Sequence, residues 1–505
     1  MNYLIAYDLG TGGIKASIFN ENGISLGDVF EQYDTYFFHE KYAEQRPSDW
    51  WRGVCSVTRR LLAESGISNK DIKGAALSGH SLVAVPIDLD GRLLAEYVPI
   101  WCDMRASAQA ENFFKSVDYE AWYRTTGNGD PAETYTVMKL IWLRENHPEI
   151  FSKTEKILGS KDYINYLLTG RMYTDPSYAS GFGVFNLKAW DYDENFIRAA
   201  NLPRRIFPDI IPSDAIVGTV TSEAADLTGL AEGTIVACGA VDNTCMSLGA
   251  TGLSEGHPYT SLGSSSWIAV TAREPVIDIK TRPFVFAHAG EGLFTSAVSI
   301  FSAGNSFRWV RDNLCRDLPA DTDAYERMNQ MAQSIPCGSN GVLFNPSLAG
   351  GSAQEFGPNL AGSFMGITLR TTREDLVRAS MEGVAMALRQ TLDILRSQTS
   401  ISGPMLICGG GSKSMIWRQI FADVFQMPIL KTNIDQNAAS LGAAALAANA
   451  CGIRNGYEWI PLCHRQEDLC LPITKNCKKY EKLMGIYTEW SAALAALGDR
   501  MADLT

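Results

Sequence analysis

The sequence predicts an α/β protein of two similar domains that hold one ligand between them. A short apolar strand at 3–7 runs into a turn of small residues at 8–13, and a second strand at 258–262 runs into a similar turn at 263–266. The two turns lie about half of the 505-residue chain apart. One hydrophobic core rarely organises so long a chain. We therefore expect two domains, at 1–247 and 248–505.

Helix and strand patterns follow a similar order in both halves. A tight-turn signal at Asn22-Gly23 separates two strands, so the chain opens as an antiparallel meander. Apolar residues then recur at three- and four-residue steps, which predicts a helix at 50–63. The remaining expected strands lie at 14–20, 24–26, 74–77, 234–238, 267–271 and 405–408, and the remaining helices at 135–146, 302–313, 415–425 and 438–449.

Composition argues against several kinds of partner. The formal net charge is −12 and no run of Lys or Arg occurs, whereas a nucleic-acid backbone requires a concentrated basic face. The chain begins directly with a strand, and its most apolar later stretch, 438–450, is shorter than the ~20 residues of a membrane span. We expect a cytoplasmic protein with a small-molecule ligand and no nucleic-acid or membrane partner. The eleven cysteines show no metal or disulfide spacing.

The first turn combines glycines with a carboxylate. Small residues leave backbone N–H groups free to point at an anion, and a phosphate can approach them closely. Alone, residues 10–13 are more typical of a hairpin turn. Asp8 favours a phosphate site, because a carboxylate beside the glycines could hold a hydrated Mg²⁺ that neutralises nucleotide phosphates. Lys15 stays open between a phosphate contact and a solvated strand residue.

A third glycine-rich turn at 408–412 follows an apolar strand and precedes a helix. It is not a P-loop, because Ser412 stands between Gly411 and Lys413 and the upstream spacing differs. A Rossmann fingerprint should open its domain, whereas this turn comes late in the chain. We interpret it as a flat glycine ledge for a nucleotide base and ribose.

Asp242 is the strongest catalytic candidate. It follows a strand and a small-residue pair in an otherwise apolar segment, and a carboxylate in such a place is costly unless it has a role or a partner. The alternative is an Asp that caps a helix starting near Thr244, and both can hold. His80 ends a strand in a Gly-Ser context, and it either lines a ligand pocket or is hydrogen-bonded in a loop.

Together these segments resemble the FGGY family of ATP-dependent carbohydrate kinases over nearly the whole chain. One family signature is similar to residues 136–146, with Lys139 and Trp142 in their expected places. The other is similar to residues 362–367 followed, after seven residues, by 375–382. The resemblance implies two ribonuclease-H-like domains, as in actin and hexokinase, with ATP and sugar in an interdomain cleft.

The resemblance also implies residue roles. Asp242 would be the general base, and Asp8 and Asp242 the metal-linked carboxylates. Nucleotide contacts would come from the two phosphate turns, the adenosine turn and one helix start, namely Asp8, Gly10, Thr11, Gly12, Gly13, Lys15, Gly263, Ser264, Ser265, Gly304, Arg308, Gly409, Gly410, Gly411 and Ser414. Sugar contacts would come from His80, Ser81, Trp101, Asp103, Arg105, Thr134, Asp242 and Asn243.

The xylulose kinase branch is the most similar one, through residues 44–47, 101–105 and 161–163. The sugar pocket departs from that branch, because Leu82 stands where those kinases carry a sugar-contacting His. A Glu-Arg pair near residues 348–352 is also missing. Such replacements change which hydroxyls a site can bind. D-xylulose is therefore one expected substrate, and another ketose, pentose or polyol is the alternative.

Rival classes share part of this pattern. An actin/Hsp70-like ATPase would have the phosphate turns without the second signature, and a sugar sensor would have lost Asp242. A phosphoesterase of the same superfamily would hydrolyse phosphates without sugar. We expect a sugar kinase that uses ATP and Mg²⁺. A homodimer is one open alternative for its assembly.

Overall fold

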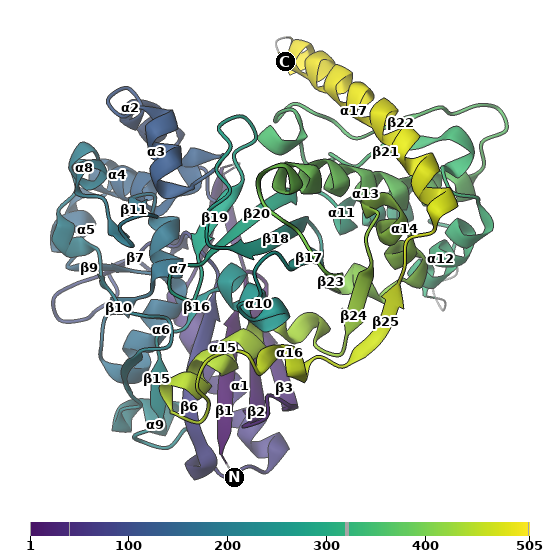
Figure 1. Cartoon of the computed structure of the whole chain (residues 1–505). Helices are drawn as coiled ribbons and strands as arrows, with labels where there is room; N and C mark the ends of the chain where they lie inside the picture. Colours follow the sequence, from purple (N-terminus) through teal and green to yellow (C-terminus); the bar gives the residue numbers. More distant parts are fainter. Residues whose placement is uncertain (1, 40, 319–322, 503, 505) are drawn as a thin grey trace.

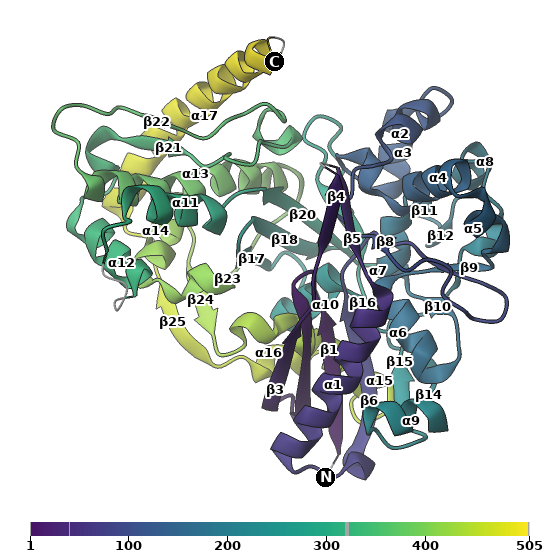
Figure 2. The same cartoon turned by 180° about the vertical axis from the view of Figure 1, so that it is seen from behind.

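The protein is described by a computed structural model that covers residues 2–39, 41–318, 323–502 and 504. Each half of the chain is built around a seven-stranded sheet (Figures 1 and 2). The first sheet has the order β14-β15-β6-β1-β2-β3, with β16 paired to β6. Its strands are β1 (Tyr3–Leu9), β2 (Gly13–Asn20), β3 (Ser25–Gln32), β6 (Ile72–Gly79), β14 (Ile216–Thr219), β15 (Ile235–Ala237) and β16 (Ala240–Val241).

The second sheet resembles the first, with one more antiparallel strand at its edge. Its order is β19-β20-β18-β17-β23-β24-β25. Three antiparallel strands in the first sheet (β3-β2-β1) and four in the second (β19-β20-β18-β17) are followed in each by two parallel strands and an antiparallel edge strand. The strands are β17 (Pro258–Leu262), β18 (Ser266–Ala272), β19 (Phe284–Ala287), β20 (Phe294–Ile300), β23 (Met405–Cys408), β24 (Ile429–Thr432) and β25 (Gln466–Cys470). The predicted α/β class and the repeat are confirmed.

Two helices lie between the sheets, α10 (Asp242–Thr251) and α15 (Ala438–Ala450) (Figures 1 and 2). Helix α10 leaves the first sheet and contacts β17 and β18, while α15 leaves the second sheet and contacts β1 and β6. They cross so closely that a Cβ on Gly249 would lie 1.8 Å from the Ala438 carbonyl oxygen, and one on Gly442 2.0 Å from that of Cys245. The boundary at 247/248, which stays a prediction, falls inside α10.

Helix α1 (Pro47–Ser65) covers one face of the first sheet by packing on β2 and β3. It buries Val54, Val57 and Leu61, as the periodicity predicts, but Trp50 is buried in place of the expected Trp51, which is half-buried. The helix begins three residues before the predicted start because Pro47 stands in its first turn, where the missing N–H costs nothing. It ends at Gly66, which adopts the left-handed conformation at φ 65°.

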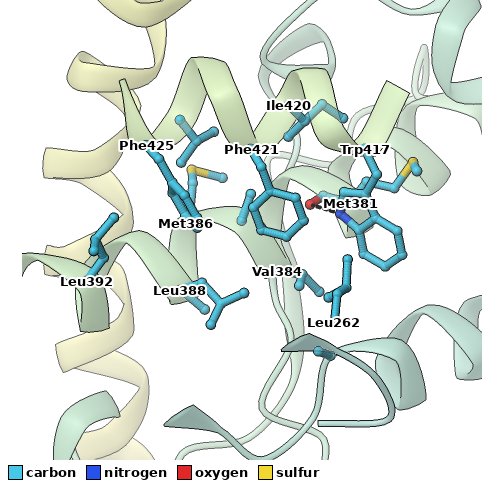
Figure 3. Packing of buried hydrophobic residues seen from close by; sticks show 14 of the residues in the cluster. Leu262, Met381, Val384, Met386, Leu388, Leu392, Trp417, Ile420, Phe421 and Phe425 are labelled. Carbon is cyan, nitrogen blue, oxygen red and sulfur yellow. Dashed lines mark hydrogen bonds between the residues drawn. The ribbon is translucent and has the colours of Figure 1, made fainter. Parts of the chain in front are cut away.

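The core of the second domain anchors the strand that leads to its glycine-rich turn. Helices α13 (Arg373–Gln398) and α14 (Met415–Phe425) pack against each other over Leu262, the last residue of β17 (Figure 3). The Trp417 indole Nε1 donates a hydrogen bond of 3.0 Å to the Met381 carbonyl (Figure 3). Burial of these large apolar side chains fixes the end of the strand.

The first domain carries a large helical insertion between β6 and β14 that the repeat did not predict. It includes α4 (Thr136–Asn146), α6 (Ser160–Thr169) and α7 (Pro176–Ala179). Strand β19 of the second domain packs against it, and the Val285 N–H donates to the Gly127 carbonyl at 3.0 Å. The last helix, α17 (Thr474–Ala502), packs on α14 and α13, and its C-terminal end projects from the second domain (Figure 1). Within the described residues no helix is both long and apolar enough to span a membrane.

Candidate functional site

Strand register brings the first-domain candidates to one sheet edge. Asp8 on β1 pairs with Ser78 on β6, and Val241 on β16 pairs with Gly79. The turn after β1, His80 after β6 and Asp242 after β16 are therefore neighbours. The Ser78 hydroxyl donates to Asp8 Oδ1 at 3.0 Å. The carboxyl ends of parallel strands are the usual place for a ligand in an open α/β sheet.

The first turn is held by side chains from outside it. Tyr33 donates from its hydroxyl to the Gly10 carbonyl, and Gln45 Nε2 donates to the Thr11 carbonyl at 2.7 Å. The Trp101 indole donates to Thr11 Oγ1 at 2.9 Å, although this ring is 46% exposed. A Cβ placed on Gly12 would meet nothing within 4 Å. The carbonyl side of the turn is thus occupied by the protein, and its tip is open.

Asp242 is the first residue of α10 and is half-buried. Its Oδ1 accepts a 2.7 Å hydrogen bond from the Asn243 N–H. Burial raises the pKa of Asp242 to about 7; the Asn243 hydrogen bond opposes this, and nearby Asp8 adds to it. The carboxyl is therefore about half ionised near neutrality, which suits a general base. The expected helix start near Thr244 is wrong, because α10 begins at Asp242 and Val241 is its N-cap.

His80 is buried and neutral. Only 1% of it is exposed, and burial lowers the pKa of its imidazole to about 4. Its Nδ1 lies 3.1 Å from the Leu9 carbonyl, which can only accept, so the proton is assigned to Nδ1. Its Nε2 is a buried acceptor without a hydrogen-bond partner among the described residues. The ring packs edge to face against Trp50 at 5.3 Å between centroids.

Asp103 and Arg105 bind each other. The Asp103 carboxylate receives 2.8 and 2.7 Å hydrogen bonds from the Arg105 side chain, and a further 2.8 Å bond from the Ala43 N–H. Arg105 also pairs with Glu44 at 2.5 Å and stacks over Tyr42. Both charges are satisfied within the protein, in the loop that carries Trp101.

Thr134, Ser81 and Asn243 are three further polar residues that the sequence placed in the sugar site. The buried Thr134 hydroxyl donates to the Pro131 carbonyl at 2.7 Å. Ser81 is half-buried next to Leu82, which has an unusual positive φ of 62°. Asn243 is half-buried on α10 beside Asp242. Of these three polar residues, Thr134 has its hydroxyl occupied locally.

Lys139 is a supporting residue to which the sequence assigned no role beyond its place in a signature. Its buried ammonium donates to the carbonyls of Leu82 at 2.8 Å and Ile100 at 2.6 Å. It therefore ties the loop after β6 to the loop that carries Trp101. Burial lowers the pKa of Lys139 to about 7, against the opposing effect of Asp103. No local pattern could have revealed two carbonyl partners so distant in sequence.

The second and third turns meet at the corresponding edge of the second sheet. Ser261 on β17 pairs with Cys408 on β23, so their turns are adjacent. The second turn is bonded to the start of α11 (Gly304–Leu314), where Gly304 N donates to Gly263 O at 2.9 Å and Asn305 N to Ser264 O at 3.0 Å. Ser264 and Ser265 are exposed at the tip of this turn.

The third turn is braced by Asp435, which accepts from Gly409 N and the Ser412 hydroxyl, each at 3.1 Å. A Cβ on Gly410 would meet nothing within 4 Å, so this part of the turn is open. Ser414 caps α14 and donates to Asn329 at 2.7 Å. Gly411 lies inside the turn against the Leu262 side chain, and Arg308 is exposed on α11.

Lys15 joins the two domains. Its ammonium donates to the Gln436 carbonyl at 2.6 Å and to Asn437 Oδ1 at 3.1 Å, both next to the start of α15. In this structure the side chain is therefore bound to the second domain.

The two carboxylates suit a hard cation. Asp8 is close enough to Asp242 for its charge to disfavour ionisation of Asp242, and carboxylate oxygens are ligands that Mg²⁺ prefers. In the described part of the chain no three His, Cys, Asp or Glu residues gather as a metal site. A cation here would complete its coordination with water and phosphate oxygens.

Comparison with known proteins agrees with this geometry. The model of the N-terminal domain of the FGGY family of carbohydrate kinases matches residues 3–249, and that of the C-terminal domain matches residues 259–451. The chain belongs to this family and is a sugar kinase, and kinases of the family take their phosphoryl group from ATP. The predicted family, enzyme class and phosphoryl donor are confirmed.

Sugar kinases of two named kinds, xylulose kinases and gluconokinases, are similar to this chain. The chain is 29% identical to the xylulose kinase of Bacillus subtilis (strain 168) over 96% of both chains, and 27% identical to the gluconokinase of that strain over 99% of this chain and 98% of the relative. Among solved structures, a ligand-bound xylulose kinase from Lactobacillus acidophilus superposes with a TM-score of 0.91 at 25% identity, covering 99% of this chain and 100% of the other. A gluconate kinase from the same organism gives the same score and identity over 99% of each chain.

Proposed function

We propose that this sugar kinase transfers the γ-phosphoryl group of ATP to a hydroxyl of a ketopentose such as D-xylulose. The observation that carries the proposal is the position of the Asp242 carboxyl at the sheet edge shared with Asp8 and an open glycine turn. The name of the sugar is supported by similarity to xylulose kinases over 96% or 97% of the chain. Gluconate is the second candidate, because gluconokinases match at nearly the same identity. Another ketose, pentose or polyol is the remaining alternative.

Asp242 is the proposed general base. The sugar hydroxyl attacks the γ-phosphorus in line with the bond to ADP, and Asp242 takes the hydroxyl proton as the new P–O bond forms. Proton transfer of this kind contributes about 10²–10⁴-fold to the rate. Most of the remaining acceleration comes from positioning and charge stabilisation by backbone N–H groups of the two phosphate turns.

Asp8 and Asp242 are the proposed residues that hold Mg²⁺ with the nucleotide. The bound ion would offset the negative charge of the phosphates and of the transferring group. Gly10 to Gly13 and Gly263 to Ser265 would contact phosphates, while Gly409 to Gly411 and Ser414 would contact adenosine. Gly304 and Arg308 would add contacts from α11. Lys15 would reach phosphate only after releasing the Gln436 carbonyl.

The proposed sugar site lies beside the first turn. Trp101 offers an exposed ring over Thr11, and His80 Nε2, Ser81 and Asn243 offer polar atoms. Asp103, Arg105 and Thr134 would act by holding their loops, since their polar groups are bonded within the protein. We also propose a cytoplasmic location, small molecules as the only ligands, and a homodimer as the assembly to test first.

A substrate panel tests the proposal. Purified protein with Mg·ATP is given D-xylulose, D-ribulose, D-gluconate and glycerol, and ADP release is followed. We expect the largest kcat/KM with D-xylulose. Asp242→Asn should lower the rate of sugar-dependent ADP release about 10²–10⁴-fold while ATP still binds, as measured by calorimetry. A clear preference for gluconate would make gluconate the substrate. Full activity of the Asp242→Asn variant would show that Asp242 is not the general base.

A further inference from the structure

The segment that delivers Asp242 is fixed at both of its ends by buried polar groups. Residues 238–241 run from the end of β15 to the start of α10. At one end, the Cys238 carbonyl accepts from Lys161 Nζ at 3.2 Å and from Asn165 Nδ2 at 2.7 Å. At the other end, the Val241 N–H donates to the Ser177 hydroxyl at 3.0 Å. Val241 is the residue immediately before the proposed base.

These partners belong to one buried ionic cluster between α6 and α7. Lys161 Nζ lies 2.6 Å from Asp162 Oδ1 and 3.0 Å from Asp175 Oδ1. All three charged side chains are fully buried. Asp175 Oδ2 in turn accepts from the hydroxyls of Ser177 at 2.5 Å and Ser213 at 2.7 Å. The Lys161 charge is thereby linked through Asp175 to the hydroxyl that holds Val241.

Such a cluster is a poor way to gain stability. Moving two charges out of water costs several kcal/mol per ion, and well-packed apolar residues of similar volume often serve the fold equally well. What a satisfied buried network provides is one defined geometry. The geometry defined here is that of the backbone leading to Asp242.

The backbone of segment 238–241 packs closely against the neighbouring strand β6. Gly239 has φ 75°, and a Cβ at this position would lie 2.2 Å from the Leu77 carbonyl oxygen on β6. Its N–H donates to the Ser213 carbonyl at 2.9 Å. Segment 238–241 therefore packs tightly against β6. The Ser177 hydroxyl fixes the position of the Val241 N–H, which is the last N–H before α10.

We propose that Ser177, oriented by Asp175 and Lys161, is a positioning residue for the Asp242 carboxylate. The inference rests on the proposed role of Asp242 as the base. Ser177 acts through the Val241 peptide. A shift of about 1 Å in a reacting group can cost 10²-fold in rate. The bond therefore serves the chemical step more than the binding of ATP or sugar.

A matched pair of serines tests this. Ser177 and Ser213 are both buried and donate to the same Asp175 oxygen, but only the Ser177 hydroxyl contacts segment 238–241. We expect Ser177→Ala to lower kcat about tenfold or more, with KM for sugar and ATP within about twofold of the wild type. Ser213→Ala should lower kcat by less than about threefold at a similar loss of melting temperature. Equal losses of kcat in the two variants would overturn the proposal.

A double-mutant cycle separates positioning from general damage. In the Asp242→Asn background, measured by single-turnover kinetics, Ser177→Ala should change the residual rate by less than about twofold, because the group it positions is gone. A loss as large as in the wild-type background would overturn the inference. If Asp242→Asn is itself fully active, the proposed base fails first. If the Ala variant does not fold, Ser177→Cys replaces it, and an unchanged kcat there counts against the proposal.

Discussion

The turns after β1 and β17 occupy the same place in two sheets of similar strand order, but they differ in what holds them and in what charge they carry. The first turn is held by the side chains of Tyr33, Gln45 and Trp101. The second is held by backbone N–H groups at the start of α11. Asp8 stands two residues before the first glycine, and Ser261 stands at the matching position of the second turn.

The difference assigns separate tasks to two copies of one structural motif. Both copies keep the strand, glycine turn and strand that can present N–H groups to phosphate. Only the first copy adds carboxylates, with Asp8 at the end of β1 and Asp242 after β16. The acidic residue near the third turn, Asp435, is instead bonded to Gly409 and Ser412. The chemistry is therefore expected at the first sheet and nucleotide binding mainly at the second.

Removing the carboxylate at the first of the two matched positions should give the largest effect on the rate. Asp8→Asn removes a carboxylate proposed to hold the cation, and we expect kcat to fall about 10²–10³-fold, as when one charge-stabilising group is lost from an active site. Ser261→Ala should change kcat by less than about twofold, since this position has no charge to lose. Steady-state kinetics over a Mg²⁺ titration measures both. Equal effects would mean that the two turns are not specialised.

Disturbing the backbone contact of the second turn should weaken ATP binding. A Cβ on Gly304 would lie 2.4 Å from the Gly263 carbonyl oxygen, so Gly304→Ala must push the turn away from α11. We expect the KM for ATP to rise about tenfold, with a smaller change in the KM for sugar. Gly485→Ala on α17 is the control, because its Cβ would meet nothing within 4 Å. An unchanged KM for ATP in the Gly304 variant would remove the second turn from the nucleotide site.

The fall in activity at acidic pH should come from protonation of Asp242, which follows the first sheet. Burial raises the pKa of Asp242 to about 7, and the base acts only when deprotonated. The kcat/KM of the wild type should therefore fall as the pH drops below about 7. The kcat limb should lie at lower pH, because a cation bound with ATP favours the carboxylate. His80, whose pKa is lowered to about 4, should not contribute between pH 5 and 8. A limb that persists in the residual activity of Asp242→Asn would contradict this assignment.

The folding stability of the protein without bound ligands should fall over the pH range in which its activity rises. A carboxyl whose folded pKa is raised above its unfolded value destabilises the fold as the pH rises from the unfolded pKa of about 4 toward 7, and the cost persists above that. Asp242→Asn removes this cost. We expect its melting temperature to exceed that of the wild type at pH 8 and to match it near pH 4. Equal melting temperatures at both pH values would show that Asp242 is not strained by burial.

The fold was predictable because it follows from local backbone patterns. Glycine turns after apolar strands gave the positions of β1, β17 and β23 and the repeat between the two halves. Within the large insertion the helix at 135–146 was predicted, but the insertion's size and its contact with β19 were not. Their packing depends on pairs such as Gly127 and Val285, which are distant in sequence.

The surroundings of the proposed sugar-contacting residues were less predictable, because these residues bond to partners elsewhere in the chain. Asp103 and Arg105 look like free sugar ligands in the sequence, yet Glu44 and Ala43 help to satisfy them. Lys139 has its role only through the carbonyls of Leu82 and Ile100. Burial and partnership decide what such residues do, and neither is visible in a single sequence.

Trp101 gives the smallest and most specific test of the first turn. Trp101→Phe keeps an aromatic ring over the site but removes the 2.9 Å bond from the indole Nε1 to Thr11 Oγ1. This bond lies at a solvent-exposed ring, so its loss should cost only about 0.5–1.5 kcal/mol. We expect the KM for sugar to rise two- to tenfold, as follows from that energy, with the KM for ATP unchanged. Thr11→Val, which removes the same bond from the other side, should give a similar change, and the double variant should add little. A change in the KM for ATP alone would place Trp101 with the nucleotide and leave the sugar site without its proposed aromatic contact.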